Sequence, residues 1–359
     1  MNTRIWKCIT LITILAVMTL TAVPAAPQSA TPTPRPTVEM KLETITSQAL
    51  TGNLFGDPAE RTVYILLPPG YAASDRRYPV VYVMPWGRGE PSENAQGFKW
   101  TMETLLRDGE IEEMIIVVPD GTNKFGMGLL MSSSTLGDYE TYATQEVVAY
   151  VDTHYRTLAT RDSRGLAGCS NGGTTSMRLG FKYPTVFSVV AATGGAWDYS
   201  PELWPSDVEP LHQLKELPRN LSDLHIGETG MIRWYLLMAA AAAPNPDNPP
   251  FYCEMPFRTV DGRAEFVPEV LARIFEFEID AAHEARRYVQ QPVRLRGILL
   301  RYGAYDHEIP ILSVHSFVQV LTELGIEHEY VEEKSGHCDS GWEEPLLKYM
   351  SDKLVFEGK

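Results

Sequence analysis

The stretch RGLAGCSNGG, residues 164–173, contains the pentapeptide GCSNG, which matches the pattern G-x-S-x-G with Ser170 at its centre. In this pattern the serine lies on a sharp turn between a strand and a helix, which exposes its hydroxyl above the end of a sheet. Small flanking residues are needed because a Cβ there would clash with the closely packed backbone. Five residues alone are weak evidence, so the surrounding elements decide what the pattern means.

The segments around Ser170 alternate between predicted strands and predicted helices. Residues 164–168 are typical of a strand, and residues 172–183 of a helix that ends before Pro184. Further short apolar runs predict strands at 61–68, 79–84, 114–119, 185–195, 293–303 and 327–333. Helices are expected at 98–110, 138–157, 310–325 and 343–356. This alternation predicts an α/β fold with a mostly parallel, doubly wound sheet covered by helices on both faces.

Residues 200 to about 290 interrupt the alternation. They hold an alanine run followed by a proline-rich turn at 244–257, and a segment at 267–289 that is expected to be one helix. The insertion follows a core strand, on the side where open α/β sheets bind ligands, so we expect it to cap a pocket. The alternative is a surface elaboration away from the pocket. The catalytic domain as a whole is expected to span 38–359.

The N-terminus is typical of a secretory signal. A basic start is followed by an apolar run at 8–23, which is shorter than the roughly 20 residues that span a bilayer. Small residues before Ala25 predict cleavage there, giving a signal peptide at 1–25, with an uncleaved anchor as the alternative. Residues 26–37 are rich in proline and threonine and predict an extended linker. The protein is therefore expected to be secreted or periplasmic.

Charge and composition restrict the partners and cofactors. The formal net charge is −15, and removing Arg4 and Lys7 with the signal peptide changes it to −17. Such a charge argues against nucleic acid and anionic membranes as partners. The eight histidines and four cysteines show no H-E-x-x-H or paired-cysteine spacing, and no phosphate-binding glycine loop stands out. We therefore expect no metal and no cofactor.

A serine nucleophile needs a histidine base and a carboxylate that orients the histidine, in the chain order Ser, acid, His. Asp306 follows the predicted strand at 293–303, and His337 follows the next predicted strand. These two residues are the predicted acid and base. The neighbouring alternatives for these roles are Glu308, His307 and Asp339, whereas His315 and His328, in a predicted helix and strand, are expected to be structural.

Two backbone N–H groups must stabilise the oxyanion of the intermediate. The first is expected from Asn171, which follows the nucleophile, and the second from the loop MPWGRGE at 84–90, where Gly87 and Arg88 are both candidates. A plain turn is the alternative for this loop. Three aromatic residues follow core strands and are candidate pocket walls, with ordinary packing as their alternative: Trp86, Trp197 and Tyr199.

The order of these motifs resembles the "putative esterase" family of α/β-hydrolases. The resemblance rests on LLPPGY, RRYPVVYVM, VVPDG, RGLAGCSNGG, PTVFSVVAATGG, GAYD and SGH. That family includes S-formylglutathione hydrolases, feruloyl and acetylxylan esterases of carbohydrate esterase family 1, enterochelin esterases and mycolyltransferases. It implies an α/β-hydrolase fold and a triad of Ser170, Asp306 and His337. Relatives usually have His-Gly or Asp-Gly before the oxyanion donor, whereas this chain has Pro85-Trp86-Gly87, which leaves the register of the second oxyanion donor open.

Cys169 precedes the predicted nucleophile and Cys338 follows the predicted base. The arrangement is similar to that of the tannase and fungal feruloyl esterase family, in which these two cysteines form a disulfide. Independently, a hydrogen bond between the serine and the histidine would bring their neighbours near the Cα separation that a disulfide requires. Secretion would supply the oxidant, and Cys253 would be left unpaired once the signal peptide is removed. Two buried free thiols are the alternative.

The predicted function is that of a secreted serine carboxylesterase acting through an acyl-serine intermediate. The ester could carry a feruloyl or acetyl group on plant polysaccharide, or be a small-molecule ester. The alternatives are a siderophore esterase or an acyltransferase of the same fold, and, in another class, a non-catalytic binding protein on a hydrolase scaffold. The sequence does not choose among the substrates, nor does it indicate the oligomeric state.

Overall fold

The computed structural model describes residues 37–200, 203, 217–223, 230–277 and 280–358. The predicted signal peptide at 1–25 and nearly all of the predicted linker at 26–37 lie outside these residues. All described residues belong to one compact unit of the chain. Within the described ranges, no helix combines the length and the apolar character needed to cross a bilayer.

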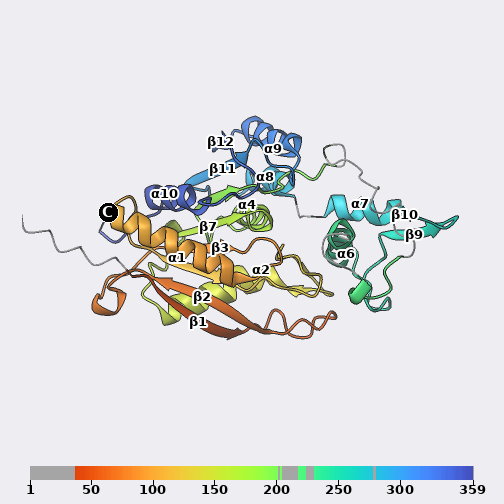
Figure 1. The fold of residues 1–359 in the computed structure, drawn as a ribbon, viewed down its shortest axis with the longest axis horizontal. Helices are drawn as coiled ribbons and strands as arrows, with labels where there is room; N and C mark the ends of the chain where they lie inside the picture. Colours follow the sequence, from red (N-terminus) through yellow and green to blue (C-terminus); the bar gives the residue numbers. More distant parts are fainter. Residues whose placement is uncertain (1–36, 201–202, 204–216, 224–229, 278–279, 359) are drawn as a thin grey trace, which may run out of the picture. The chain divides into compact units, whose positions relative to one another are not determined.

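The main sheet of the described residues has eight strands in the order β1-β2-β4-β3-β7-β8-β11-β12 (Figure 1). From β4 to β12 neighbouring strands pair in parallel, whereas β2 is antiparallel to both β1 and β4. The mostly parallel sheet that the sequence predicts is therefore confirmed. Its strands are β1 (Glu39–Thr46), β2 (Glu60–Leu67), β3 (Val80–Met84), β4 (Ile115–Pro119), β7 (Arg164–Cys169), β8 (Val189–Thr193), β11 (Gly297–Gly303) and β12 (Glu329–Glu333).

Helices cover both faces of this sheet because its central strands are apolar on both sides. In β3, Tyr82 packs into one buried cluster, whereas Val81 and Val83 pack into the other. The cluster of Val81 and Val83 is closed by two helices that lie side by side, α1 (Pro91–Asp108) and α10 (Glu343–Lys353) (Figure 1). The opposite face carries α3 (Val147–His154), α4 (Asn171–Lys182), α8 (Ala281–Tyr288) and α9 (Ile311–Glu323).

Two helix boundaries differ from the sequence prediction for local reasons. Helix α1 begins seven residues earlier than expected, because Pro91 suits a first helical turn and the Glu90 carboxylate accepts the N–H of Ser92. The segment expected as one helix at 138–157 consists of α2 (Tyr139–Thr141), a π-helical stretch (Tyr142–Glu146) and α3. Smaller elements are β5 (Ser132–Ser133), β6 (Gly137–Asp138) and the 3-10 turns η1 (Tyr71–Ala73), η3 (Arg161–Ser163) and η4 (Leu221–Asp223).

The described part of the insertion holds two helices and a hairpin: α6 (Gly230–Ala242), β9 (Phe257–Val260), β10 (Arg263–Phe266) and α7 (Pro268–Glu276). The single helix expected at 267–289 is wrong. A new helix, α8, starts after Asp280, whose carboxylate accepts the N–H groups of Ala282 and His283. Because α8 packs on α4 and α9, it belongs to the helical layer over the sheet and not to the insertion.

Candidate active site

The backbone makes a sharp turn at Ser170, which we call the elbow, between the end of β7 and the start of α4, the elbow helix. Ser170 has φ 54° and ψ −124°, in a region that residues other than glycine rarely adopt. A Cβ added at Gly172 would overlap the carbonyl oxygen of Met84, and one added at Gly168 would overlap Gly172 itself. The two glycines therefore allow the close packing that presents the serine hydroxyl at the carboxyl ends of β3 and β7.

The structure brings Ser170, His337 and Asp306 into one chain of hydrogen bonds. His337 Nε2 lies 2.9 Å from Ser170 Oγ, and His337 Nδ1 lies 2.7 Å from Asp306 Oδ2. Asp306 follows β11 and His337 follows β12, so both come from turns at the same edge of the parallel sheet as the serine. The imidazole therefore has one nitrogen toward the hydroxyl and the other toward the carboxylate.

The Asp306 side chain is fully buried, and its environment favours the charged form. Burial by itself would raise the pKa of this carboxyl. The hydrogen bond with His337, the N–H groups of Ile309 and Glu308, and the charge of His337 together outweigh burial and hold the pKa below its ordinary value. An ionised carboxylate at this position can fix the tautomer of the histidine.

The alternative residues considered for these roles have other contacts. Glu308 donates its N–H to Asp306, while its own side chain lines the pocket described below. Asp339 accepts the N–H of Gly336. The other histidines lie elsewhere: His307 is exposed, His315 pairs with Glu332, and His328 contacts the carbonyl of Ile326.

A disulfide joins Cys169 to Cys338, with 6.2 Å between their Cα atoms, so the predicted pair is present in the structure. It links the residue before Ser170 to the residue after His337. Gly194, at the end of β8, leaves room for this bridge, because a Cβ there would lie 3.2 Å from Cys338 Sγ. Cys253 is the free, buried cysteine of the described residues, and burial raises the pKa of its thiol to about 12.

The two expected sources of oxyanion donors, Asn171 and the loop at 85–89, lie next to each other. We call residues 85–89 the oxyanion loop. Asn171 opens α4, so its backbone N–H lies at the positive end of that helix. In the oxyanion loop, Gly87 has φ 57°, and its carbonyl accepts hydrogen bonds from Asn171 Nδ2 at 2.7 Å and from the N–H of Gly128 at 3.1 Å. The N–H of Gly89 closes a turn onto the carbonyl of Trp86.

A pocket of about 210 Å³ opens at Ser170 and His337. Its wall is largely apolar and aromatic. Beyond the serine and the histidine it is formed by Met127, Asn171, Thr174, Ala196, Tyr199, Trp234, Tyr235, Phe275, Glu308 and Ile309. Trp234 and Tyr235 come from α6 and Phe275 from α7, so the insertion lines the pocket as a cap would. Such a wall suits an apolar or aromatic ligand with few polar contacts.

Of the three aromatic residues expected at the pocket, the structure brings only Tyr199 to its wall. Trp197 is fully buried beneath the elbow, where its Nε1 donates to the carbonyl of Gly173 at 3.1 Å and its ring packs near Phe317. This packing role corrects the expectation for Trp197. Trp86 is 39% exposed on the oxyanion loop and does not line the cavity.

Sequence reasoning missed Met127 and the aromatic residues of the insertion. The rings of Trp234 and Tyr199 pack at a tilt with centroids 5.4 Å apart, and Tyr235 meets Trp234 edge to face at 4.9 Å. The adjacent pair Trp234-Tyr235, just before the alanine run, could have marked the insertion as a source of aromatic pocket residues. Its partner across the pocket is 35 residues away in sequence, so only the tertiary structure reveals the contact.

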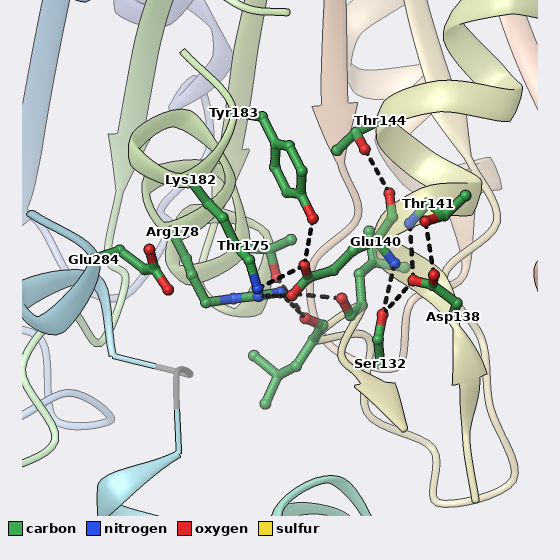
Figure 2. Close-up of polar contacts among 12 residues, drawn as sticks. Ser132, Asp138, Glu140, Thr141, Thr144, Thr175, Arg178, Lys182, Tyr183 and Glu284 are labelled. Carbon is green, nitrogen blue, oxygen red and sulfur yellow. Dashed lines mark hydrogen bonds and ion pairs between the residues drawn. The ribbon is translucent and has the colours of Figure 1, made fainter. Parts of the chain in front are cut away.

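A buried polar cluster links α4 to α2 and to the loop before α2 (Figure 2). The Glu140 carboxylate pairs with Arg178 and Lys182 and accepts the hydroxyl of Tyr183. Burial alone would raise the pKa of Glu140, but the two cations and these hydrogen bonds lower it to about 2. Arg178 also donates to the carbonyls of two residues of the neighbouring loop, Leu129 and Leu130.

The fold and the site together define an α/β-hydrolase: a mostly parallel sheet, a serine on the strand-to-helix turn, and a histidine and a carboxylate on later turns. Residues 58–227 match the family model described as putative esterase, which confirms the resemblance found in the sequence.

Among the described residues, no group of three or more His, Cys, Asp or Glu side chains is placed to hold a metal ion.

Curated relatives carry esterase names. The chain is 31% identical over 149 residues to an endo-1,4-beta-xylanase/feruloyl esterase of Xylanibacter ruminicola, a match over 40% of this chain and 20% of that protein. It is 32% identical over 135 residues to an esterase of Mycobacterium tuberculosis, over 37% of this chain and 28% of the relative. The matches thus span less than a third of either relative's length.

Among solved structures, an S-formylglutathione hydrolase of Staphylococcus aureus has the same fold. It superposes with a TM-score of 0.55, over 87% of this chain and 96% of that one, at 10% sequence identity. At this level of identity the likeness concerns the fold alone.

Proposed function

We propose that this chain is a serine carboxylic ester hydrolase with Ser170 as nucleophile, His337 as general base and acid, and Asp306 as the residue that orients His337. The continuous hydrogen-bonded chain from Ser170 Oγ through both imidazole nitrogens to the buried Asp306 carboxylate carries the proposal. The esterase names of the relatives support the same reaction class.

In the first half of the reaction, His337 Nε2 takes the proton of Ser170 Oγ while Oγ forms a bond to the ester carbonyl carbon. The carbonyl oxygen becomes an oxyanion. The intermediate then collapses, the bond to the alcohol oxygen breaks, and His337 gives its proton to the departing alcohol. In the second half His337 Nε2 takes a proton from a water molecule, whose oxygen forms a bond to the acyl carbon. The bond from this carbon to Ser170 Oγ then breaks, His337 returns the proton to Oγ, and the carboxylic acid leaves.

Gly87 is the better candidate of the two for the second oxyanion donor, beside the N–H of Asn171. The N–H of Arg88 belongs to the same peptide plane as the carbonyl of Gly87, and in a trans peptide the two groups point in opposite directions. Because that carbonyl faces the Asn171 side chain, the N–H of Arg88 points away from it. The N–H of Gly87 belongs to the preceding peptide and is free of this restriction.

The wall of the pocket supports an acyl group with a flat aromatic ring. Tyr199, Trp234, Tyr235 and Phe275 supply apolar faces around a cavity of about 210 Å³ beside the serine. We propose hydroxycinnamoyl esters, such as feruloyl groups attached to polysaccharide, as the substrate class. The name of the Xylanibacter relative includes feruloyl esterase, which is consistent with this choice. The disulfide beside the site suits an oxidising compartment, in keeping with the proposed signal peptide and secretion.

A panel of p-nitrophenyl and hydroxycinnamoyl esters, tested on the purified mature protein, examines the proposal directly. We expect hydrolysis by the wild-type protein, and loss of at least about three orders of magnitude in kcat for Ser170→Ala, because this variant lacks the hydroxyl that forms the acyl intermediate in the proposed mechanism. The thermal unfolding midpoint should remain near that of wild type. If Ser170→Ala keeps a tenth of the wild-type turnover in preparations free of other esterases, the assignment of the nucleophile is wrong.

A further inference from the structure

The side chain of Asn171 has a contact that the serine turn itself does not require. Any residue at this position supplies the backbone N–H that follows the nucleophile. Here the side-chain amide also donates a hydrogen bond of 2.7 Å to the carbonyl of Gly87 on the oxyanion loop. Asn171 thus carries one proposed oxyanion donor on its backbone. Its side chain holds Gly87, which carries the other proposed donor.

Gly87 needs such a restraint because of its own chemistry. A residue without Cβ can rotate about φ and ψ over most of their range, and Gly87 adopts φ 57°. The carbonyl of Gly87 lies on one side of its Cα, and the proposed donor N–H lies on the other. The Asn171 bond fixes the peptide plane on the carbonyl side of this Cα, whereas the plane that carries the N–H of Gly87 is held by the bond from the N–H of Gly89 to the carbonyl of Trp86. Fixing the carbonyl side limits rotation about φ and ψ of Gly87, so the Asn171 bond adds to the restraint on the N–H.

The second hydrogen bond to this carbonyl also depends on helix α4. It comes from the N–H of Gly128 at 3.1 Å. The loop that contains Gly128 is held by Thr175, whose hydroxyl donates to the carbonyl of Leu129, and by Arg178, which donates to the carbonyl of Leu130 and is paired with Glu140 (Figure 2). The carbonyl of Gly87 is therefore held by α4 twice, once directly and once through this loop.

We propose that the Asn171 side chain is a positioning residue for the second oxyanion donor. It holds the peptide that follows Gly87 and, through the Cα of Gly87, limits the motion of the N–H that points to the developing oxyanion, without itself touching the reacting atoms. The inference rests on the proposed function. Since Gly128 retains its own bond to the carbonyl, loss of the Asn171 side chain should loosen the donor and not remove it.

The test compares Asn171→Ala and Asn171→Asp with wild type. Aspartate has the shape of asparagine but donates no hydrogen bond to a carbonyl when ionised. The measurements are kcat and KM for p-nitrophenyl acetate, and the affinity for an arylboronic acid, which forms a tetrahedral adduct on a serine hydroxyl. Removing an oxyanion donor costs 10²–10³ in kcat, so a loosened donor should cost about tenfold or more. We expect KM to change less than about threefold, and the affinity for the boronic acid to fall in parallel with kcat.

Asn94→Ala is the matched control. The Asn94 amide is buried and donates 3.2 Å to the carbonyl of Glu90, just after the oxyanion loop, without contacting Gly87. This variant should lower the thermal midpoint but leave kcat and the boronic acid affinity near wild type. The inference is overturned if the Asn171 variants keep both quantities, or if they behave like the control.

A crystal structure of Asn171→Ala separates this inference from the proposed function, because it does not depend on turnover. We expect the Gly87 carbonyl to be rotated or to occupy two orientations. A carbonyl that stays in place overturns the inference even if the protein is a proven esterase. Conversely, a wild-type protein that cleaves no ester refutes the proposed function, while the orientation of Gly87 in the variant still decides whether Asn171 holds it.

Discussion

Two acidic residues lie at the points where the insertion leaves and rejoins the hydrolase layers. The Asp198 carboxylate is buried and accepts hydrogen bonds from the hydroxyls of Ser200 and Ser316. Asp280 accepts the N–H groups of Tyr199 and Ala282, and thereby ties the pocket residue Tyr199 to the start of α8. Burial, followed by the charge of Asp198, raises the pKa of Asp280 to about 6. Near neutral pH this carboxylate is therefore charged at a cost in stability.

Asp280→Asn should stabilise the protein at pH 8. Because the pKa of Asp280 is higher in the folded than in the unfolded state, its charged form lowers the free energy of unfolding. This loss of stability is absent below about pH 4, where the carboxyl is protonated in both states, and complete above about pH 6. Asparagine removes the charge and keeps the oxygen that accepts the N–H of Ala282, but its amide nitrogen replaces the oxygen that accepts the N–H of Tyr199 at 3.3 Å, so the gain is smaller than the full cost of the charge. A rise from 3.8 to about 6 corresponds to at most about 3 kcal/mol.

Thermal unfolding at pH 8 and pH 4 measures this effect. We expect the midpoint of the variant to exceed that of wild type at pH 8 and to approach it at pH 4. Asp75→Asn, at an exposed position, serves as the control and should change neither value. A variant that is less stable than wild type at both pH values would show that the charge is needed for the helix cap.

At the scale of elements, helix α6 supplies two aromatic residues to the pocket that opens at Ser170 and His337. Trp234 lines the pocket, contacts the Tyr199 ring at a tilt and packs edge to face against Tyr235. Tyr199 is in turn buried next to the elbow helix, and its hydroxyl bonds with Thr174, another pocket residue. The aromatic cluster and Ser170 thus line the same pocket, so the cluster would contact the acyl group of the proposed substrate.

Trp234→Ala should change selectivity more than basic activity. Removing the indole deletes one flat face of the pocket, and an aromatic acyl group packs on that face whereas an acetyl group is too small to reach it. We expect kcat/KM for methyl ferulate to fall at least about tenfold more than kcat/KM for p-nitrophenyl acetate. Trp100→Ala, an exposed tryptophan on α1, is the control and should leave the ratio unchanged. Equal losses on both esters would assign Trp234 a structural role.

The elements that the sequence predicted well are those with a local signal. The elbow could be located because a strand, a small-residue turn and a helix follow one another within 20 residues. The break between α7 and α8 could not, because no proline or glycine marks it and the second helix begins at a cap from Asp280. The pocket wall was also missed in part, since Trp234 and Phe275 reach the serine only through the tertiary fold.

At the scale of the whole molecule, the site depends on the order of the strands. Ser170 follows β7 and His337 follows β12, and β8 and β11 lie between those two strands in the sheet. The two residues are 167 positions apart in sequence and yet 2.9 Å apart at their side chains. The distance between these two side chains therefore depends on the pairing of four strands, β7, β8, β11 and β12. The disulfide between the neighbouring residues fixes the two turns to each other covalently.

Breaking the disulfide should lower turnover and stability together. The bridge closes a loop of 169 residues, and in the chain-entropy model such a cross-link stabilises a fold by at most about 5 kcal/mol. It also anchors covalently the turn that carries His337, which lies between β12 and α10. We expect reduction, or Cys338→Ser, to lower the thermal midpoint by several degrees and to reduce kcat, because a mobile His337 spends less time within reach of Ser170 Oγ.

Cys253→Ser provides the control for this last experiment, since that thiol is buried and free. The kcat of the Cys253→Ser variant should match that of wild type, and reductant should lower it as it lowers that of wild type. Reductant should have no further effect on the kcat of the Cys338→Ser variant. Peptide mapping without reduction, on protein exported to an oxidising compartment, identifies the bridge itself. A link from Cys169 to Cys253, or three free thiols, would mean that His337 is held in register by the sheet and its loop alone; the triad geometry would then need no covalent support.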